Sequence, residues 1–372
     1  MTNAHQIPQS ELQRTARQMN LPGFGPEQQA ALHAAHVLVI GAGGLGCPIM
    51  QTLAATGVGK ILLIDDDTVD LTNIHRQILF GADDVGRKKT EVAAERLKAL
   101  QPDIEVTIID GRMTTDNAVE LLEGIDVLID GSDTFATKFL AADAAEITGT
   151  PLVWGSVLRY RGDMALWWSG PGAPEDGVGL RDLYPDQPDA DSVPDCATAG
   201  VLGVTTSVVG GLMATEVIKF LTGIGQSEVG TLMMYDALGA SISEFHVTRD
   251  PARALTTSLR TSYGEVCAVP DGAPELLAQL EAGKLIPLDV REPHEKAIAD
   301  MPVPGHLLPT SDLEIQPRLA ADFLDSVEAG SRVLVYCASG IRSQWFVDTF
   351  EPLAKARGIE LVNFPGGVKL LA

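Results

Sequence analysis

Residues 37–46 read VLVIGAGGLG and place the glycines of a G-x-G-x-x-G motif directly after a short apolar run. An apolar run of this length is typical of a buried strand, and the residues after the motif have helical spacing. Further apolar runs alternate with helical stretches as far as about residue 156. This alternation predicts a doubly wound, Rossmann-like α/β domain around a largely parallel sheet.

The individual elements follow from the same pattern. We expect strands at 37–40, 60–65, 105–110, 126–130 and 151–156, helices at 45–55, 88–100 and 136–147, and closing strands near 231–236 and 241–247. Residues 170–195 are rich in Pro, Gly and Asp and predict a surface loop. The uncharged stretch 196–215 holds too many glycines and hydroxyls for a membrane span, so it predicts a buried, closely packed helix.

The chain is long enough, at 372 residues, for two domains. A second strand–helix alternation begins at LIPLDVRE (285–292) and ends near LVNFPGG. We therefore expect a nucleotide-binding domain at 1–250, a linker at 251–271 and a smaller α/β domain at 272–372.

Charge and the N-terminal segment narrow the class of protein. The formal net charge of −23 disfavours nucleic acid and anionic membranes as partners, because both would repel the chain. Glu11, Arg14 and Arg17 interrupt the N-terminal segment, which does not have the pattern of a signal peptide. We expect a cytoplasmic protein.

The cysteines are few and widely spaced. No C-x-x-C pair occurs among Cys47, Cys196, Cys267 and Cys337, so no four-thiolate zinc site and no dense disulfide framework is expected. In the cytoplasm these residues stay thiols, and one of them is free to carry chemistry. We expect Cys47 and Cys267 to be structural.

The first glycine motif predicts a nucleotide site. Gly41, Gly43 and Gly46 allow the backbone to approach phosphates, and the helix that follows supplies amide donors. Asp65 ends the next strand, where a carboxylate binds ribose hydroxyls. These residues alone do not distinguish NAD from ATP.

The residues that follow favour ATP. Asn73, Arg76, Lys88 and Lys89 come just after the ribose-binding position, and cations there would stabilise the charge that develops during attack on a phosphorus atom. Asp133 follows the fourth strand, at the edge where ligands bind, and its carboxylate suits Mg²⁺. The alternative for each charge taken singly is a solvated surface side chain.

Residues 11–250 also resemble the MoeB/ThiF family, the bacterial relatives of ubiquitin-activating enzymes. The resemblance rests on motifs in the family's order: RTARQMNLPGFG, GAGGLG, DDDTVDLTNIHRQ, GRKKTE, DGSDTFATK, CATAGVLG and GTLMMYDAL. It implies ATP-dependent adenylation of the C-terminal Gly-Gly carboxylate of a small ubiquitin-like sulfur carrier protein, and a homodimer.

The resemblance also implies roles for single residues. Gly44 would lie in the phosphate loop, and Asp65 would bind the ribose. Asn73 and Arg76 would contact the phosphates, and Lys89 would stabilise them. Asp133 would coordinate Mg²⁺, and Arg17 would reach the partner's nucleotide across the dimer interface. Thr134 stands where the family usually has Asn, which puts one polar contact in question. Relatives bind zinc through two C-x-x-C pairs, and the matching segments here, EDGVGLRDLYP and RDPARALTT, contain no cysteine. We therefore expect no zinc. Cys196 precedes A-x-x-G-V-L-G, where relatives also carry a cysteine. In some of them this cysteine can bond covalently to the carrier or its sulfur, and a small buried residue at the start of a helix is the equal alternative.

The second chemical motif is VLVYCASGIRSQW, in which Cys337 follows a predicted strand. Backbone amides of the loop Ala338, Ser339, Gly340, Ile341 and Arg342 would cradle an anion, and together with the arginine would lower the pKa of the thiol. Protein tyrosine phosphatases need C-x5-R around a phosphate, whereas this loop is C-x4-R and suits a persulfide. The less favoured alternative is a structural cysteine.

Residues 272–372 resemble the rhodanese domain through LIPLDVREPHEKAIADMPVPGHLLP, VLVYCASGIRSQWF and VNFPGGV. The resemblance implies that Cys337 carries sulfane sulfur, while Arg291 and Glu292 are structural. The donor would be thiosulfate or a persulfide-carrying desulfurase.

Together the two motifs predict a bifunctional adenylyltransferase and sulfurtransferase that makes a thiocarboxylate, similar to the fused enzymes of molybdopterin synthesis. The pathway, whether molybdenum cofactor, thiamin or another, stays open. Two alternatives are an NAD-dependent oxidoreductase fused to a rhodanese domain and a non-catalytic scaffold that docks carrier proteins.

Overall fold

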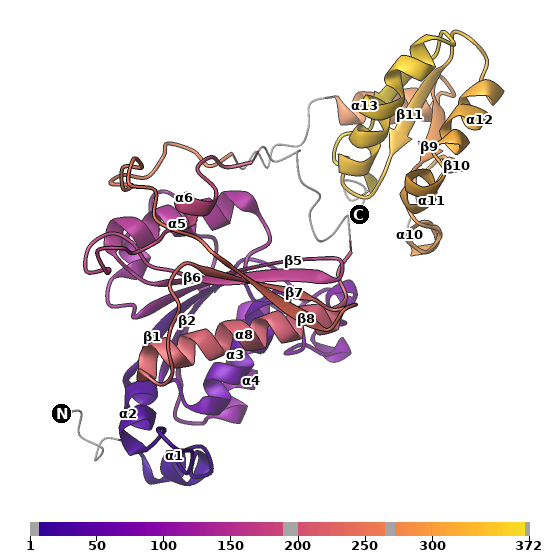
Figure 1. Cartoon of the computed structure of the whole chain (residues 1–372). Helices are drawn as coiled ribbons and strands as arrows, with labels where there is room; N and C mark the ends of the chain where they lie inside the picture. Colours follow the sequence, from indigo (N-terminus) through magenta and orange to yellow (C-terminus); the bar gives the residue numbers. More distant parts are fainter. Residues whose placement is uncertain (1–6, 189–199, 265–271, 299, 369–372) are drawn as a thin grey trace. The chain divides into compact units, whose positions relative to one another are not determined.

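The computed structural model of the chain describes residues 7–188, 200–264, 272–298 and 300–368. The chain forms two compact units, residues 1–265 and 266–372. Each unit has its own sheet and its own hydrophobic clusters. Figure 1 labels their helices and strands.

The first unit is built on one eight-stranded sheet. Its strands are β1 (His36–Ile40), β2 (Lys60–Asp65), β3 (Glu105–Asp110), β4 (Val127–Asp130), β5 (Leu152–Leu158), β6 (Arg161–Trp167), β7 (Thr231–Asp236) and β8 (Ser241–His246). The order across the sheet is β3-β2-β1-β4-β5-β6-β7-β8. The first five strands are parallel, and β6, β7 and β8 pair antiparallel with their neighbours.

Helices cover both faces of this sheet. They are α1 (Gln9–Arg14), α2 (Pro26–Ala34), α3 (Gly46–Thr56), α4 (Lys89–Leu100), α5 (Phe135–Thr148), α6 (Leu180–Leu183) and α8 (Gly203–Thr222), with 3₁₀ turns η2 (Leu71–Asn73), η3 (Ala82–Asp84) and η4 (Glu120–Leu122). α3, α4 and α8 lie on one face, and α5 and α6 on the other (Figure 1). Strand β1 serves both cores because its side chains alternate: Val37 and Val39 pack on the first face, Leu38 and Ile40 on the second.

The predicted strands of the first unit are all present within two residues of their expected bounds. Strand β6 was not predicted, because its sequence RGDMALW begins with charged residues and has no helix before it. It follows β5 after two residues and pairs with it antiparallel. The predicted loop at 170–195 contains the short helix α6, and its part after residue 188 lies outside the described residues.

Helix α8 contains the end of the uncharged stretch. By length and hydropathy it is the one helix, among the described residues, that could cross a membrane. However, it contacts α2, α3, β5 and β6, and Val209, Met213, Ala214 and Val217 are fully buried. A methyl group on Gly210 would meet the ring of Pro48 in α3 at 2.6 Å. These contacts are those of a core helix with close backbone packing.

Residues 251–264, expected to be part of a linker, pack on the first unit. Arg253 forms ion pairs with Glu146 and Asp182, and the Tyr263 hydroxyl donates to Asp143 at 2.6 Å. The sequence pattern does not show which residues pair with the buried carboxylates of α5 and α6. The packing of residues 251–264 on the first unit was therefore not predicted. Residues 265–271 lie outside the described residues, and the proposed domain boundaries stay a prediction.

The second unit has a four-stranded parallel sheet in the order β10-β9-β11-β12. Its elements are α9 (Ala273–Glu281), β9 (Ile286–Asp289), α10 (Pro293–Ile298), β10 (His306–Leu307), α11 (Thr310–Ile315), α12 (Arg318–Ser326), β11 (Arg332–Tyr336), α13 (Ile341–Lys355) and β12 (Glu360–Asn363). Val333 and Val335 of β11 face one cluster, Leu334 and Tyr336 the other. The predicted fold class, two successive α/β domains, is confirmed.

Candidate functional site

The glycine motif forms a tight loop between β1 and α3. Gly41 has φ of +88°, a backbone conformation that favours glycine. A methyl group on Gly46 would overlap the carbonyl oxygen of Gly41, and one on Gly44 would meet Thr206 of α8 at 3.0 Å. The loop therefore brings bare backbone to the N-terminus of α3, where amide groups can bind phosphate.

Asp65 ties this loop to the end of β2. Its Oδ2 accepts a hydrogen bond from the Ala42 amide at 2.7 Å, and Oδ1 accepts from the Asp67 amide at 2.8 Å. Burial raises the pKa of Asp65, and Lys89 and the two amides oppose this effect. The carboxylate is thus held against the glycine loop, where it lines the cavity.

Cationic side chains flank the same edge of the sheet. Lys89, at the start of α4, is 4 % exposed and donates to Asp67 Oδ2 at 2.8 Å. Arg76 follows η2, and its Nη1 donates to the Thr72 carbonyl at 3.1 Å. These contacts with residues of the β2–α4 connection fix both cationic side chains close to the glycine loop.

Asp133 and Thr134 lie between β4 and α5, and both are exposed. Thr134 is the N-cap of α5, and its Oγ1 accepts from the Thr137 amide at 3.2 Å. Among the described residues, none forms a hydrogen bond or ion pair with the Asp133 carboxylate. An unpartnered carboxylate at a cavity edge fits an oxygen ligand of Mg²⁺.

These residues surround one cavity of about 350 Å³, which falls in the range of small-molecule sites. The predicted residues that line it are Gly41, Gly43, Gly44, Asp65, Asn73, Arg76, Lys89, Asp133 and Thr134. Gly46 shapes the loop without lining the cavity. Arg17 is exposed and outside the lining, and Cys196 lies outside the described residues. The cavity also contains residues that sequence reasoning missed: Gln77, Arg112, Thr137, Ser156, Val201 and Thr206.

A buried ion pair below the cavity was also missed. Lys138 Nζ lies 3.0 Å from Asp130 Oδ2 and donates to the Gly155 carbonyl at 2.6 Å, with Lys138 and Asp130 both buried. Asp130 Oδ1 also accepts from the Ser132 amide and hydroxyl. The sequence signal for this pair was Asp130, a carboxylate at the end of an apolar strand. A buried carboxylate there needs a cationic partner, and Lys138 of the following helix provides it.

In the second unit, Cys337 directly follows β11 and is fully buried. Its Sγ accepts hydrogen bonds from the Gly340 amide at 3.1 Å and from the Ser343 hydroxyl at 3.4 Å. The Val368 amide donates to the Cys337 carbonyl at 2.9 Å, so the segment after β12 packs over the loop. The thiol therefore accepts one hydrogen bond from the loop and one from Ser343 in the first turn of α13.

Arg342 of the loop is held by Glu295 of α10, a partner the sequence did not reveal. Nη1 lies 2.7 Å from Oε2, and Nη2 lies 2.6 Å from Oε1. Burial alone would lower the pKa of Arg342, but pairing with Glu295 raises it, with a contribution from the nearby Cys337 charge. In turn, Arg342 outweighs burial and lowers the pKa of Glu295.

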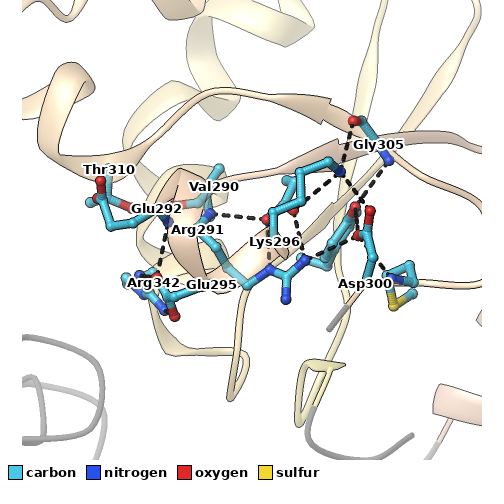
Figure 2. Close-up of polar contacts among 12 residues, drawn as sticks. Val290, Arg291, Glu292, Glu295, Lys296, Asp300, Gly305, Thr310 and Arg342 are labelled. Carbon is cyan, nitrogen blue, oxygen red and sulfur yellow. Dashed lines mark hydrogen bonds and ion pairs between the residues drawn. The ribbon is translucent and has the colours of Figure 1, made fainter. Parts of the chain in front are cut away.

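Arg291 belongs to a separate cluster of ion pairs (Figure 2). It contacts Asp289 at 2.8 Å and Asp300 at 3.0 Å, and Lys296 contacts Asp300 at 2.8 Å. Glu292 accepts a hydrogen bond from the Ser311 hydroxyl at 2.8 Å. This cluster connects β9 with the segment before β10.

The two segments in which the sequence predicts that zinc is absent, EDGVGLRDLYP and RDPARALTT, are joined by side chains. Arg253 donates to Asp182 and to Glu146 through two pairs of contacts of 2.7–3.0 Å. A guanidinium between carboxylates does not fit a structural zinc site, which is built from Cys and His side chains, and neither segment contains one. Across the described ranges, no three His, Cys, Asp or Glu side chains are grouped to hold a metal. The expected absence of zinc stays a prediction.

Comparison with known proteins agrees with both halves of the chain. Residues 15–255 match the model of the ThiF family. The chain is 37 % identical to the "probable adenylyltransferase/sulfurtransferase MoeZ" of Mycobacterium tuberculosis, over 98 % of this chain and 94 % of that protein. It is 45 % identical to the "sulfur carrier protein adenylyltransferase" of Thermus thermophilus, over 65 % and 89 %. The structure of E. coli MccB with ATP is similar in fold, with a TM-score of 0.53 and 22 % identity over 68 % of this chain and 75 % of that one. The chain belongs to the ThiF family.

Proposed function

We propose that this protein uses ATP to activate the C-terminal glycine of a ubiquitin-like sulfur carrier and then converts it to a thiocarboxylate. One observation carries the proposal: the cavity collects a glycine loop, Asp65, Asp133 and the cationic side chains of Arg76, Lys89 and Arg112, on a chain that also presents Cys337 in a six-residue loop. The names of the Mycobacterium and Thermus relatives support both half-reactions. The chain is an adenylyltransferase and a sulfurtransferase.

In the first half-reaction, a carboxylate oxygen of the carrier attacks the α-phosphorus of ATP. The bond from this phosphorus to the bridging oxygen breaks, pyrophosphate leaves, and an acyl-adenylate remains. The amides at the start of α3 bind phosphate, and Asp65 holds the ribose. Arg76 and Lys89 stabilise the charge that grows on the phosphate oxygens, and Asn73 adds a polar contact.

Asp133 would hold Mg²⁺, because its exposed carboxylate has no partner among the described residues and hard cations prefer such oxygens. When bound, the ion would supply positive charge to the phosphates. Arg17 would act from the partner subunit of a homodimer, and the protein would work in the cytoplasm.

In the second half-reaction, the outer sulfur of a Cys337 persulfide attacks the activated carbonyl. The carbon–oxygen bond to AMP breaks, and an acyl disulfide forms on Cys337. A thiol then attacks the Cys337 sulfur, which releases the thiocarboxylate and leaves a disulfide on the enzyme. That thiol is Cys196 or an external reductant.

Mass spectrometry of intact carrier proteins tests this function. Candidate carriers ending in Gly-Gly would be incubated with the protein, ATP, Mg²⁺ and a sulfur donor. The expected product has gained the mass difference between one sulfur and one oxygen atom, and only when ATP is present. A tightly bound nicotinamide nucleotide, with no adenylate formed from any carrier, would instead support the oxidoreductase alternative.

A further inference from the structure

The cysteine loop carries one cation, Arg342, and Glu295 neutralises it. Both terminal nitrogens of the guanidinium contact the two carboxylate oxygens, at 2.7 and 2.6 Å, in the parallel geometry that is strongest for this pair. The side chains are 11 % and 22 % exposed, so water screens the pair only partly. Figure 2 shows Arg342 against Glu295, beside the cluster of Arg291, Lys296 and Asp300.

Two further cations of the described part of this unit, Arg291 and Lys296, are also paired. Arg291 contacts Asp289 and Asp300, and Lys296 contacts the same two carboxylates, at 3.6 and 2.8 Å. Glu292 does not pair with Arg342, but its negative charge is close enough to raise the pKa of Arg342. Arg291, Lys296 and Arg342, which are labelled in Figure 2, each have a carboxylate partner.

Two kinds of sulfur donor make different demands on such a loop. When the Cys337 thiolate attacks the outer sulfur of thiosulfate, the sulfur–sulfur bond breaks and sulfite leaves with the electron pair and two negative charges. When it attacks the outer sulfur of a thiol persulfide, a thiolate leaves with one charge and can take up a proton. Cations that are free to bind favour the first donor, because they stabilise the dianion.

We propose that Glu295 is a specificity-determining residue of sulfur transfer: by neutralising Arg342 it selects a thiol persulfide over thiosulfate as the donor to Cys337. This inference rests on the proposed sulfurtransferase function. In the step, the donor's sulfur–sulfur bond breaks, a new one forms on Cys337, and a thiolate leaves, with no net oxidation or reduction.

Two buried polar groups of the loop are available to the transferred sulfur. Arg342 Nε and Ser339 Oγ are both buried, and neither has a hydrogen-bond partner within the described part of the chain. Each can donate one hydrogen bond, which suits the single charge of a terminal persulfide sulfur. The pairing with Glu295 leaves the Nε–H group available while it removes the net charge.

The test compares donors in single turnovers of the full-length protein. The rate of persulfide formation on Cys337 would be followed by intact mass with thiosulfate and, separately, with cysteine persulfide. We expect Glu295→Gln, which keeps the shape of the side chain, to raise the rate with thiosulfate about tenfold. The substitution removes one unit charge close to the site, and the interaction energy of such a charge with the leaving dianion corresponds to a rate change of about this size. The cysteine persulfide rate should stay within about twofold.

Matched variants separate neutralisation from a general charge effect. Glu292→Gln removes the same charge from a neighbouring residue that contacts Ser311 instead of Arg342, so its donor preference should stay near that of the wild type. Glu295→Asp keeps the charge and should retain the wild-type preference. In an Arg342→Gln background, Glu295→Gln should lose its effect on thiosulfate.

The outcomes distinguish this proposal from the one on which it rests. An unchanged ratio of the two rates in Glu295→Gln, or an equal change in Glu292→Gln, would overturn the role of Glu295 while leaving sulfur transfer intact. If the wild type gained no sulfur from either donor, the sulfurtransferase function would fail, and this inference with it.

Discussion

Arg253 and Asp182 are joined by two parallel contacts, Nε to Oδ1 at 2.7 Å and Nη2 to Oδ2 at 2.9 Å. The same guanidinium also contacts both oxygens of Glu146 on α5. Asp182 is fully buried, and the arginine side chain is 13 % exposed. One arginine after β8 therefore connects α5 and α6.

Removal of this arginine should destabilise the first unit. We expect Arg253→Ala to lower the free energy of unfolding by about 3 kcal/mol, because two buried carboxylates lose their partner. Denaturant unfolding followed by a probe in the first unit would measure this. Arg161→Ala, at an exposed ion pair of 3.9 Å with Asp236, is the control and should cost less than about 1 kcal/mol. Equal effects of the two substitutions would contradict the role of Arg253.

Removal of zinc should leave the stability of the protein unchanged. Because an arginine and carboxylates join the two segments, purified protein should contain no stoichiometric zinc, and a chelator should not shift its unfolding midpoint. Elemental analysis and unfolding with and without chelator would check both statements. A tightly held zinc at about one per chain, whose loss unfolds the protein, would refute them.

Glu146 should make the first unit sensitive to acid. Burial alone would raise its pKa, but hydrogen bonds from Arg253, Ser169 and Thr256 lower it from 4.5 to about 2. A carboxyl group with a lowered folded pKa contributes stability above its unfolded pKa, and this contribution is lost as pH falls toward the folded pKa. The contribution should therefore be complete above about pH 4.5 and disappear toward pH 2.

The measurement is the difference in unfolding free energy between wild type and Glu146→Gln as a function of pH. We expect the wild type to be more stable at neutral pH and the difference to narrow between pH 4.5 and 2. Glu123→Gln, at an exposed position before β4, should show no such narrowing. A constant difference across this range would mean that Glu146 is not the titrating group.

Asp133 should be needed for adenylation and dispensable for sulfur transfer. Asp133→Ala removes a carboxylate that lines the cavity without a partner in the described structure, so the fold should be unaffected. We expect carrier-dependent ATP–pyrophosphate exchange to fall at least about a hundredfold while thiosulfate:cyanide transfer persists. Asp83→Ala, at an exposed aspartate outside the cavity, should keep both activities. Normal exchange in Asp133→Ala would place the metal elsewhere.

Cys337 should separate the two chemistries in the opposite direction. Cys337→Ala removes one buried sulfur atom from the second unit and no residue of the nucleotide cavity. It should keep carrier-dependent exchange near the wild-type rate and lose thiosulfate:cyanide transfer and thiocarboxylate formation. Cys196→Ala should keep thiosulfate:cyanide transfer. Thiocarboxylate made at the wild-type rate by Cys337→Ala would show that another cysteine carries the sulfur.

Much of the cavity in the first unit could be predicted because its residues follow the ends of strands that the sequence marks clearly. Gly41, Asp65 and Asp133 each come within three residues of a parallel strand end, and such ends meet at one edge of a sheet. Strand β6 was missed because its N-terminal residues are charged and its pairing partner, not its composition, makes it a strand.

The sequence by itself determined the two α/β units, the glycine loop and the position of Cys337, because these depend on local periodicity and on residues close along the chain. Only the tertiary structure decided which charges neutralise one another. Glu295 is 47 residues from Arg342, and Glu146 is 107 residues from Arg253. Such pairs form because a buried charge requires a partner, and the partner is whichever residue the packing brings near. No pattern in the sequence specifies it.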